Sequence, residues 1–90
     1  MYRVLIVERD VLMQKALETM ISKQHSFQVV EKISAGEDVV KVCDDNSIDI
    51  VFMGLMLNGM SGIDVSERMH RKHPEIMIYI LSPYAKRFYT

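Results

Sequence analysis

Few residues of this sequence could do chemistry at the end of a predicted strand, and most of them follow one apolar segment. Glu8, Arg9 and Asp10 come directly after the aliphatic run at residues 4–7. Carboxylate oxygens are hard ligands of the kind that divalent cations prefer. Here an arginine stands between the two acids, and its positive charge opposes a cation at that place. Asp10 also has a structural alternative, because aspartate is a preferred N-cap residue of helices.

Two further apolar runs, at residues 48–53 and 76–81, end at residues with little chemistry of their own. The first is followed by Gly54, which has no side chain to act as a nucleophile, and the second by Ser82, whose hydroxyl could donate a hydrogen bond. A small polar residue at the end of a strand needs no ligand to explain it. Residues 54–62 contain three glycines, and we interpret them as a turn into a helix, because no glycine-rich phosphate-binding motif follows the first apolar run.

The elements that position these residues alternate between strands and helices. Unbroken apolar runs are typical of parallel strands covered on both faces, whereas residues 27–33 mix apolar and charged side chains and predict a strand at the sheet edge. The predicted strands are residues 3–8, 27–33, 48–53 and 76–81, and the predicted helices are residues 11–23, 37–44 and 63–72. This alternation predicts an α/β fold, a doubly wound parallel sheet wrapped by helices, in which ligands bind at the carboxyl ends of the strands.

Length and composition restrict the classes of function. Ninety residues form a single domain, residues 1–90, with no second domain. Eleven Lys and Arg balance twelve Asp and Glu, which argues against direct contact with nucleic acid or an anionic membrane. No apolar run approaches the roughly 20 residues that span a bilayer, and no signal peptide precedes the first strand, so we expect a cytoplasmic protein. Cys43 and the three histidines are not spaced as metal ligands, so we expect no metal site.

Several short segments together resemble the receiver domains of two-component response regulators, which have a CheY-like, flavodoxin-like fold. The similarity extends over essentially the whole chain, in order and at the expected spacing. The matching segments are residues 4–8 followed by Asp10, residues 49–53 before residues 60–62, and residues 80–82. Within that family, Ser82-Pro83-Tyr84 with Tyr89 is similar to receivers fused to AraC-type DNA-binding domains.

The resemblance also implies which parts of a receiver site are missing. The phosphoacceptor aspartate of the family corresponds to Gly54, and the two metal-binding acids correspond to Glu8 and Arg9. Ser82 matches the switch hydroxyl, whereas the family's pocket lysine and the aromatic switch residue of the fifth strand have no counterpart before Thr90. The resemblance therefore implies a degenerate, C-terminally truncated receiver with strand order 2-1-3-4, lacking the fifth strand and the last helix. Such a chain is not an enzyme, cannot accept phosphate at the usual site and has lost the magnesium site because of Arg9.

Arg9 has two interpretations. Its positive charge could take the place of the cation and pair with Glu8 or Asp10, which would hold the site in one state without a cofactor. Alternatively, Arg9 is an exposed loop residue, because a partly buried ion pair adds little net stability.

Three functions are compatible with these residues. The first is a receiver-like module that acts in transcriptional regulation through phosphorylation-independent protein contacts, with a sensor kinase or an output domain as partner. The second is a small-ligand or nucleotide-binding protein of the flavodoxin-like type, because this topology serves many unrelated functions. The third is a truncated regulator without function. The sequence leaves open the cognate kinase and signal, whether the natural protein continues past Thr90 into a DNA-binding domain, and whether Gly54 and Arg9 are natural.

The missing fifth strand and last helix predict self-association. Residues 76–81 would form an exposed sheet edge, and part of one sheet face beside the first helix would be uncovered. A second copy is the simplest cover for both surfaces. We therefore predict a homodimer whose contacts include Ile76, Ile78, Ile80, Tyr84, Phe88 and Tyr89.

Overall fold

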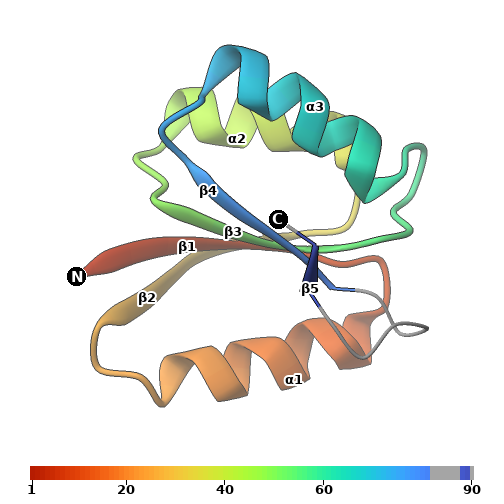
Figure 1. Ribbon diagram of the computed structural model, residues 1–90. Coiled ribbons are helices and arrows are strands. Elements are labelled where there is room, and N and C mark those ends of the chain that lie inside the picture. Colours follow the sequence, from red (N-terminus) through yellow and green to blue (C-terminus); the bar gives the residue numbers. More distant parts are fainter. Residues whose placement is uncertain (82–87, 90) are drawn as a thin grey trace.

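The protein is a single twisted sheet with helices on both faces (Figure 1). The computed structural model describes residues 1–81 and the backbone of residues 88–89. The elements are, in chain order, β1 (Tyr2–Val7), α1 (Val11–Ser22), β2 (Phe27–Ile33), the short 3₁₀ helix η1 (Gly36–Asp38), α2 (Val39–Asp45), β3 (Ile50–Gly54), α3 (Gly62–Lys72), β4 (Met77–Leu81) and β5 (Phe88–Tyr89). Every predicted strand and helix is present, and the α/β class is confirmed.

The strand order is β2-β1-β3-β4-β5. The first four strands are parallel, which confirms the predicted order 2-1-3-4. The prediction that no strand follows β4 needs a correction. The two-residue β5 pairs antiparallel with the carboxyl end of β4, placing Tyr89 opposite Ile80 and Phe88 opposite Leu81. On the side away from β3, the last two residues of β4 are therefore paired with β5. No described strand lies beside its first three residues on that side.

The pattern of burial along the strands follows from their place in the sheet. In the central strand β1, residues 4–7 are completely buried, because helices cover both of its faces. The edge strand β2 instead exposes Glu31 and Lys32, as its mixed sequence predicts. Continuous aliphatic sequence is thus found where both faces of the sheet are covered.

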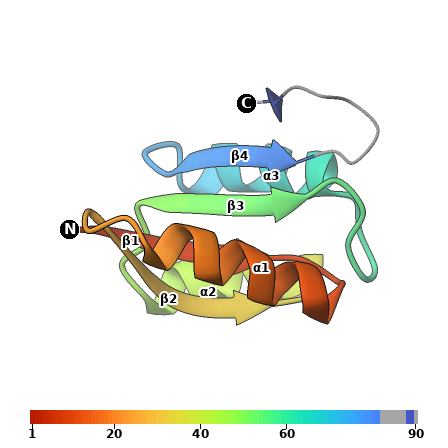
Figure 2. The same ribbon diagram turned by 90° about the horizontal axis from the view of Figure 1, so that it is seen from below.

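The core consists of two clusters, one on each face of the sheet. The cluster under α2 and α3 is the larger and contains Leu5, Val7, Val39, Cys43, Ile48, Val51, Met53, Leu57, Val65, Met69, Ile76 and Ile80. The cluster under α1 contains Val4, Ile6, Leu17, Ile21 and Ile50. Figure 2 shows why it is smaller: α1 lies over β1 and β2, and within the described part of the chain no helix lies over β3 and β4 on this face.

The apolar residues of α1 are divided unequally between core and solvent. Of the apolar residues that recur at helical spacing in α1, Leu17 and Ile21 are buried. Leu12 is 76% exposed and Met20 is 63% exposed. These two residues remain exposed because α1 packs on the sheet along one narrow stripe and has no described helix beside it. No helix among residues 1–81 is long and apolar enough to cross a membrane.

Candidate functional site

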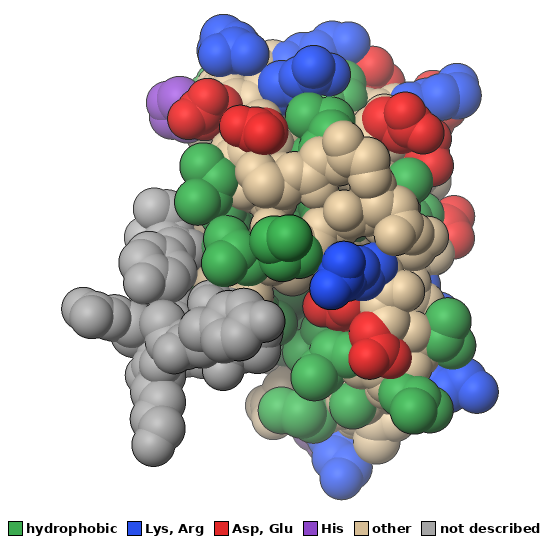
Figure 3. All heavy atoms as spheres, turned by 90° about the vertical axis from the view of Figure 1, so that its right-hand side faces the viewer, with side chains coloured by type: hydrophobic (Ala, Val, Ile, Leu, Met, Phe, Trp, Pro, Cys, Tyr) green, Lys and Arg blue, Asp and Glu red, His purple; other side chains and the backbone are tan. Residues whose placement is uncertain are grey.

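The carboxyl ends of β1, β3 and β4 meet at one end of the sheet. In the parallel register Val7 pairs with Met53, and Gly54 pairs with Leu81. The residues that follow β1 therefore lie beside the end of β3, as expected for the functional end of such a sheet. Figure 3 looks onto this end, whose middle is made mostly of backbone, uncharged polar side chains and hydrophobic side chains, with a small group of charged ones.

Glu8 is the acidic side chain that lies against Gly54. Its backbone N–H donates to the Ile33 carbonyl oxygen over 2.9 Å, which holds the residue at the end of β1. Its carboxylate oxygen Oε2 accepts a hydrogen bond from the Asp10 backbone N–H at 2.8 Å. The other oxygen, Oε1, lies over Gly54, where a Cβ atom would be only 2.6 Å away from it. The Glu8 carboxylate thus occupies the space in which a side chain at position 54 would begin.

The backbone around Gly54 is also closely packed. The loop after β3 returns to it at Gly62, whose N–H donates to the Leu55 carbonyl oxygen over 2.7 Å. A Cβ atom on Gly62 would overlap the Gly54 carbonyl oxygen, so only glycine permits this approach at the start of α3. The loop therefore packs tightly against the end of β3, and backbone rather than side chains forms this part of the site.

Asp10 is an N-cap residue, as its structural interpretation predicts. Its Oδ1 accepts hydrogen bonds from the backbone N–H groups of Leu12 at 2.9 Å and Met13 at 3.3 Å. These bonds satisfy two of the free N–H groups in the first turn of α1. One of the two carboxylate oxygens of Asp10 is thereby used to cap α1.

Arg9 is an exposed loop residue. Within residues 1–81 no carboxylate lies within 4.0 Å of its guanidinium group, and Glu8 and Asp10 both direct their carboxylates to backbone N–H groups instead. The hypothesis that Arg9 pairs with either acid was therefore wrong. Backbone donors next to the two carboxylates satisfy them without the cost of desolvating an ion pair.

Several predicted residues lie outside the described part of the chain. These are the switch hydroxyl of Ser82 and the predicted dimer contact Tyr84, while Phe88 and Tyr89 are described only as the backbone of β5. Among the residues that are described, no group of three or more His, Cys, Asp or Glu side chains could hold a metal ion. The described part of the site therefore presents one carboxylate, Glu8, and no nucleophile at position 54.

The predicted dimer contacts on β4 lie on the wrong face for that role. Ile76 and Ile80 are buried in the larger core, and Ile78 packs against it. Residues alternate between the two faces of a strand, so Met77 and Tyr79 point to the opposite face, where Met77 is largely exposed. The sequence did not distinguish the two faces, because all six residues from Ile76 to Leu81 are apolar.

Sequence analysis also missed an ionic cluster at the opposite end of the sheet. The Asp44 carboxylate accepts a hydrogen bond from Lys72 Nζ at 2.8 Å and lies 2.7 Å from His73 Nε2. Glu75 lies 3.4 Å from the other ring nitrogen of His73. The hydrogen bonds from Lys72 and His73 hold the pKa of Asp44 below its ordinary value. No local motif indicates this cluster, because Asp44 lies 28 residues before Lys72 in the chain.

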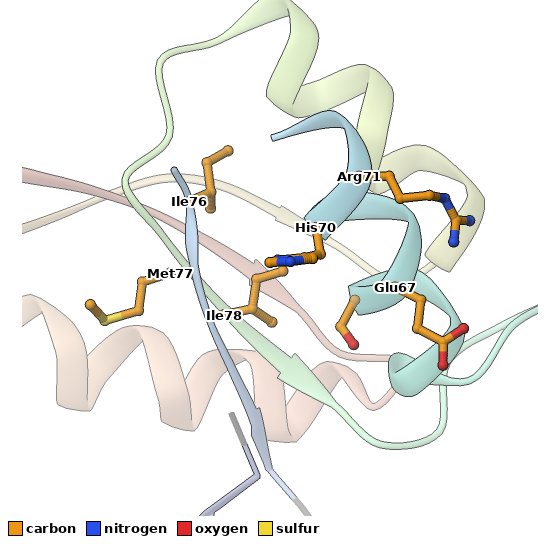
Figure 4. A pocket seen from close by; sticks show the side chains of 7 residues that line it. Glu67, His70, Arg71, Ile76, Met77 and Ile78 are labelled. Carbon is orange, nitrogen blue, oxygen red and sulfur yellow. The ribbon is translucent and has the colours of Figure 1, made fainter. Parts of the chain in front are cut away.

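A groove of about 520 Å³ runs between α3 and β4. One side is lined by Met77 and Ile78 of β4 and by Ile76 just before it, and the other by Ser66, Glu67, His70 and Arg71 of α3 (Figure 4). In the close-up, Glu67 and Arg71 point outward from α3 and away from the strand. The groove is thus apolar along β4 and polar along its rim, and the acid and the base on α3 do not converge on a common point within it.

Comparison with known proteins identifies the fold and the family. Residues 4–90 match the family model described as the response regulator receiver domain. The response regulator UvrY of Escherichia coli K12 is 28% identical over 82 residues, and the response regulator GacA of Pseudomonas aeruginosa is 26% identical over 82 residues. Each alignment covers 91% of this chain and 38% of the relative, so the chain spans well under half the length of these relatives.

Solved structures agree with this match at the level of the fold. The response regulatory domain of the protein MrkE from Klebsiella pneumoniae superposes with a TM-score of 0.83 at 21% identity, covering 93% of this chain and 69% of that chain. The MaeR response regulator bound to beryllium trifluoride superposes with a TM-score of 0.86 at 23% identity, covering 97% of this chain and 70% of that chain.

Proposed function

Because the chain belongs to the family of response regulator receiver domains, we propose that it is a receiver module that no longer accepts a phosphoryl group and acts through protein contacts alone. The position of the Glu8 carboxylate over Gly54 is the main support for this proposal. Receiver domains are generally signalling modules rather than enzymes, so the loss of the acceptor would remove a switch and leave contact with other proteins as the remaining means of action.

The chemistry of phosphoryl acceptance supports the proposal. An acceptor must supply a nucleophilic oxygen at the end of β3, and Gly54 has no side chain. The Glu8 carboxylate is carried by the residue after β1 rather than by the end of β3, and its Oε2 accepts a hydrogen bond from the Asp10 backbone N–H.

The magnesium ion that receiver domains use at the phosphorylation site does not fit the residues present here. The second metal-binding acid is replaced by Arg9, a permanent cation. Asp10 is committed to capping α1, and position 54 supplies no ligand. A divalent cation would therefore meet one carboxylate and one positive charge, which is a poor donor set for Mg²⁺.

Mass spectrometry of the intact protein tests the loss of phosphorylation. We expect no added phosphoryl group after incubation with acetyl phosphate and Mg²⁺. Gly54→Asp alone should restore little phosphorylation, because Arg9 still opposes the cation. The double variant Arg9→Asp and Gly54→Asp is the informative comparison, because it supplies an acceptor carboxylate and also removes the opposing charge. A phosphoryl group on the unmodified sequence would overturn the proposal.

For the whole protein we propose a role in transcriptional regulation, with a DNA-binding output domain and a sensor kinase as partners. The relatives support this role, because they are named response regulators and one solved neighbour is the two-component response regulator RcsB in complex with DNA. The balanced charge of the present chain argues that DNA contact belongs to an output domain. A transcriptional reporter that responds to deletion of these 90 residues would test this role.

We further propose that the module associates as a homodimer. A large part of one sheet face is apolar and has no described element over it. Light scattering coupled to size exclusion at micromolar concentration should give twice the 10.4 kDa mass of one chain. A single species with the 10.4 kDa mass of one chain that unfolds cooperatively would contradict the homodimer.

A further inference from the structure

The helices α2 and α3 lie side by side on one face of the sheet, and a second groove runs between them (Figure 1). Its volume is about 470 Å³, which falls within the range of roughly 300–1,000 Å³ that is typical of ligand clefts. One wall comes from η1 and α2 and the other from α3, and all of its lining residues belong to these three elements. We call it the α2–α3 groove.

The base of the α2–α3 groove is apolar, and contacts between its walls bound it at both ends. Val65 is buried in the larger core, and Val40 packs against that core. At one end Gly36 brings η1 against α3, because a Cβ atom at this position would lie only 2.8 Å from Val65 Cγ2. At the other end Lys72 Nζ on α3 donates to the Asp44 carboxylate on α2 over 2.8 Å. The groove is thus a part of the fold itself.

The α3 wall of the groove is basic. Arg68 and Arg71 are exposed and lie three residues apart, with Lys72 beside them. Lys72 is paired with Asp44, but within residues 1–81 no carboxylate lies within 4.0 Å of either guanidinium group. Arg71 points outward from α3 and away from β4 (Figure 4). Among the described residues, Glu37 is the one acidic residue that lines the groove, so two permanent cations face one carboxylate.

The fold itself gains little from this arrangement of charges. Arg68 lies three residues before Arg71 and four before Lys72, and like charges at these spacings destabilise a helix. The helix dipole favours positive charge in the last turn of α3, which contains Arg71 and Lys72, but Arg68 lies before that turn. A residue that opposes the stability of its own helix is expected where it serves a partner.

We propose that the α2–α3 groove binds an acidic segment of a partner protein. Carboxylates of the segment pair with Arg68 and Arg71, and an apolar side chain between them packs on Val40 and Val65. The planar guanidinium group binds a carboxylate through two parallel hydrogen bonds, which favours arginine at such a contact. The inference rests on the proposed function, in which the module acts through protein contacts, and it names the chemistry of the partner.

Two observations favour an acidic protein segment over other anions. The apolar base of the groove offers contact area to a side chain, and a small inorganic anion would use only the charged rim. The chain as a whole has a formal net charge of −1, which argues against nucleic acid as the occupant.

Anisotropy of a fluorescein-labelled peptide made of repeated Glu-Glu-Leu units tests the groove. Arg68→Glu and Arg71→Glu should each raise the dissociation constant of this peptide by about fivefold or more, because a pairing cation becomes a repelling charge. Lys15→Glu is the matched control, since it makes the same change of charge at an exposed residue of α1, on the other face of the sheet. At about 0.15 M salt it should leave the dissociation constant unaltered, because distant surface charges are screened.

A second peptide, with glutamine in place of glutamate, should bind more weakly to the parent protein. Circular dichroism checks that each variant is folded, and Arg68→Gln replaces Arg68→Glu if that variant is not. The inference is overturned if the acidic peptide does not bind, or if Lys15→Glu weakens binding as much as the two groove variants. Displacement of the peptide by inorganic phosphate at an equal concentration would indicate a small-anion site and would also overturn it. Modification by acetyl phosphate would contradict the proposed function alone, because peptide binding is measured without a phosphoryl donor.

Discussion

The two faces of the sheet are built from similar residues but are covered to different extents. On the face under α2 and α3, Met53 and Met69 are completely buried. On the face under α1, Met20 remains 63% exposed although it also lies on a helix that packs against the sheet. Two helices side by side shield each other's flanks, whereas a single helix shields only the stripe beneath it. Hydrophobic residues therefore build the larger core on one face and stay partly exposed on the other.

The face under α2 and α3, which we call the covered face, also has an ionic cluster that joins its two helices at one end. The Asp44 carboxylate on α2 accepts a hydrogen bond from Lys72 on α3 and lies beside His73, which follows α3. On the opposite face of the sheet α1 is attached to β2 through Gln14 and Glu18, and its other flank has no such bond to a described residue. The covered face should thus dominate the free energy of unfolding.

A matched pair of methionine substitutions gives the largest expected difference between the faces. Met69→Ala should lower the free energy of unfolding by about 2–5 kcal/mol, because it leaves a cavity in the larger core. Met20→Ala should change the stability of the monomer by less than about 0.5 kcal/mol, as is usual for an exposed side chain. Urea unfolding at low protein concentration measures both. Equal losses for the two variants would show that the faces contribute alike.

The reactivity of Cys43 should also reflect the covered face. Burial is the main cause that raises the pKa of its thiol from 9.0 to about 11, and the nearby Asp44 and Glu75 carboxylates add to the shift. At pH 8 the thiolate fraction should be about a hundredfold smaller than for an unshifted thiol, and alkylation should be slowed at least to that extent. Iodoacetamide labelling of native and urea-unfolded protein measures the ratio. Similar rates in the two states would mean that this face opens readily.

Two glycines at the carboxyl end of β3 differ in what a larger side chain would meet, which is backbone at Gly62 and the Glu8 side chain at Gly54. Gly62→Ala should cost about 1–3 kcal/mol, because its Cβ would meet the backbone of Gly54 and force the loop to move. Gly54→Ala should cost less, since only the flexible end of Glu8 has to move aside. Thermal unfolding of both variants checks the order. The reverse order would show that the Glu8 carboxylate is held more firmly than the loop.

The smallest expected effect concerns pH and the ionic cluster of the covered face. Because the pKa of Asp44 is lowered in the folded protein, first by Lys72 and then by His73, its stabilisation is present above the ordinary carboxyl pKa of about 4. It is lost as the pH falls below that value and through the lowered pKa. Asp44→Asn should therefore flatten the fall of the melting temperature in acid. Parallel curves for the two proteins would contradict this role of Asp44.

Much of the fold can be predicted from local sequence. The aliphatic run at residues 4–7 predicts a central strand because such a segment is stable only when both faces are covered, and the structure buries it completely. The charged residues of β2 predict its place at the edge, which is also confirmed. The absence of a side chain at Gly54 and the charge of Arg9 are properties of the residues themselves and do not depend on how the chain folds.

Other features depend on contacts between distant segments. The segment from Ile76 to Leu81 has apolar side chains on both of its faces. Only the position of α3 over Ile76 and Ile80 decides that Met77 and Tyr79 remain at the surface. The Glu8 carboxylate reaches Gly54 because parallel pairing of β1 with β3 brings together residues that are far apart in the chain. Sequence determined which side chains exist and which segments become strands, and tertiary packing decided which of them are covered, because burial depends on what lies opposite a residue in space.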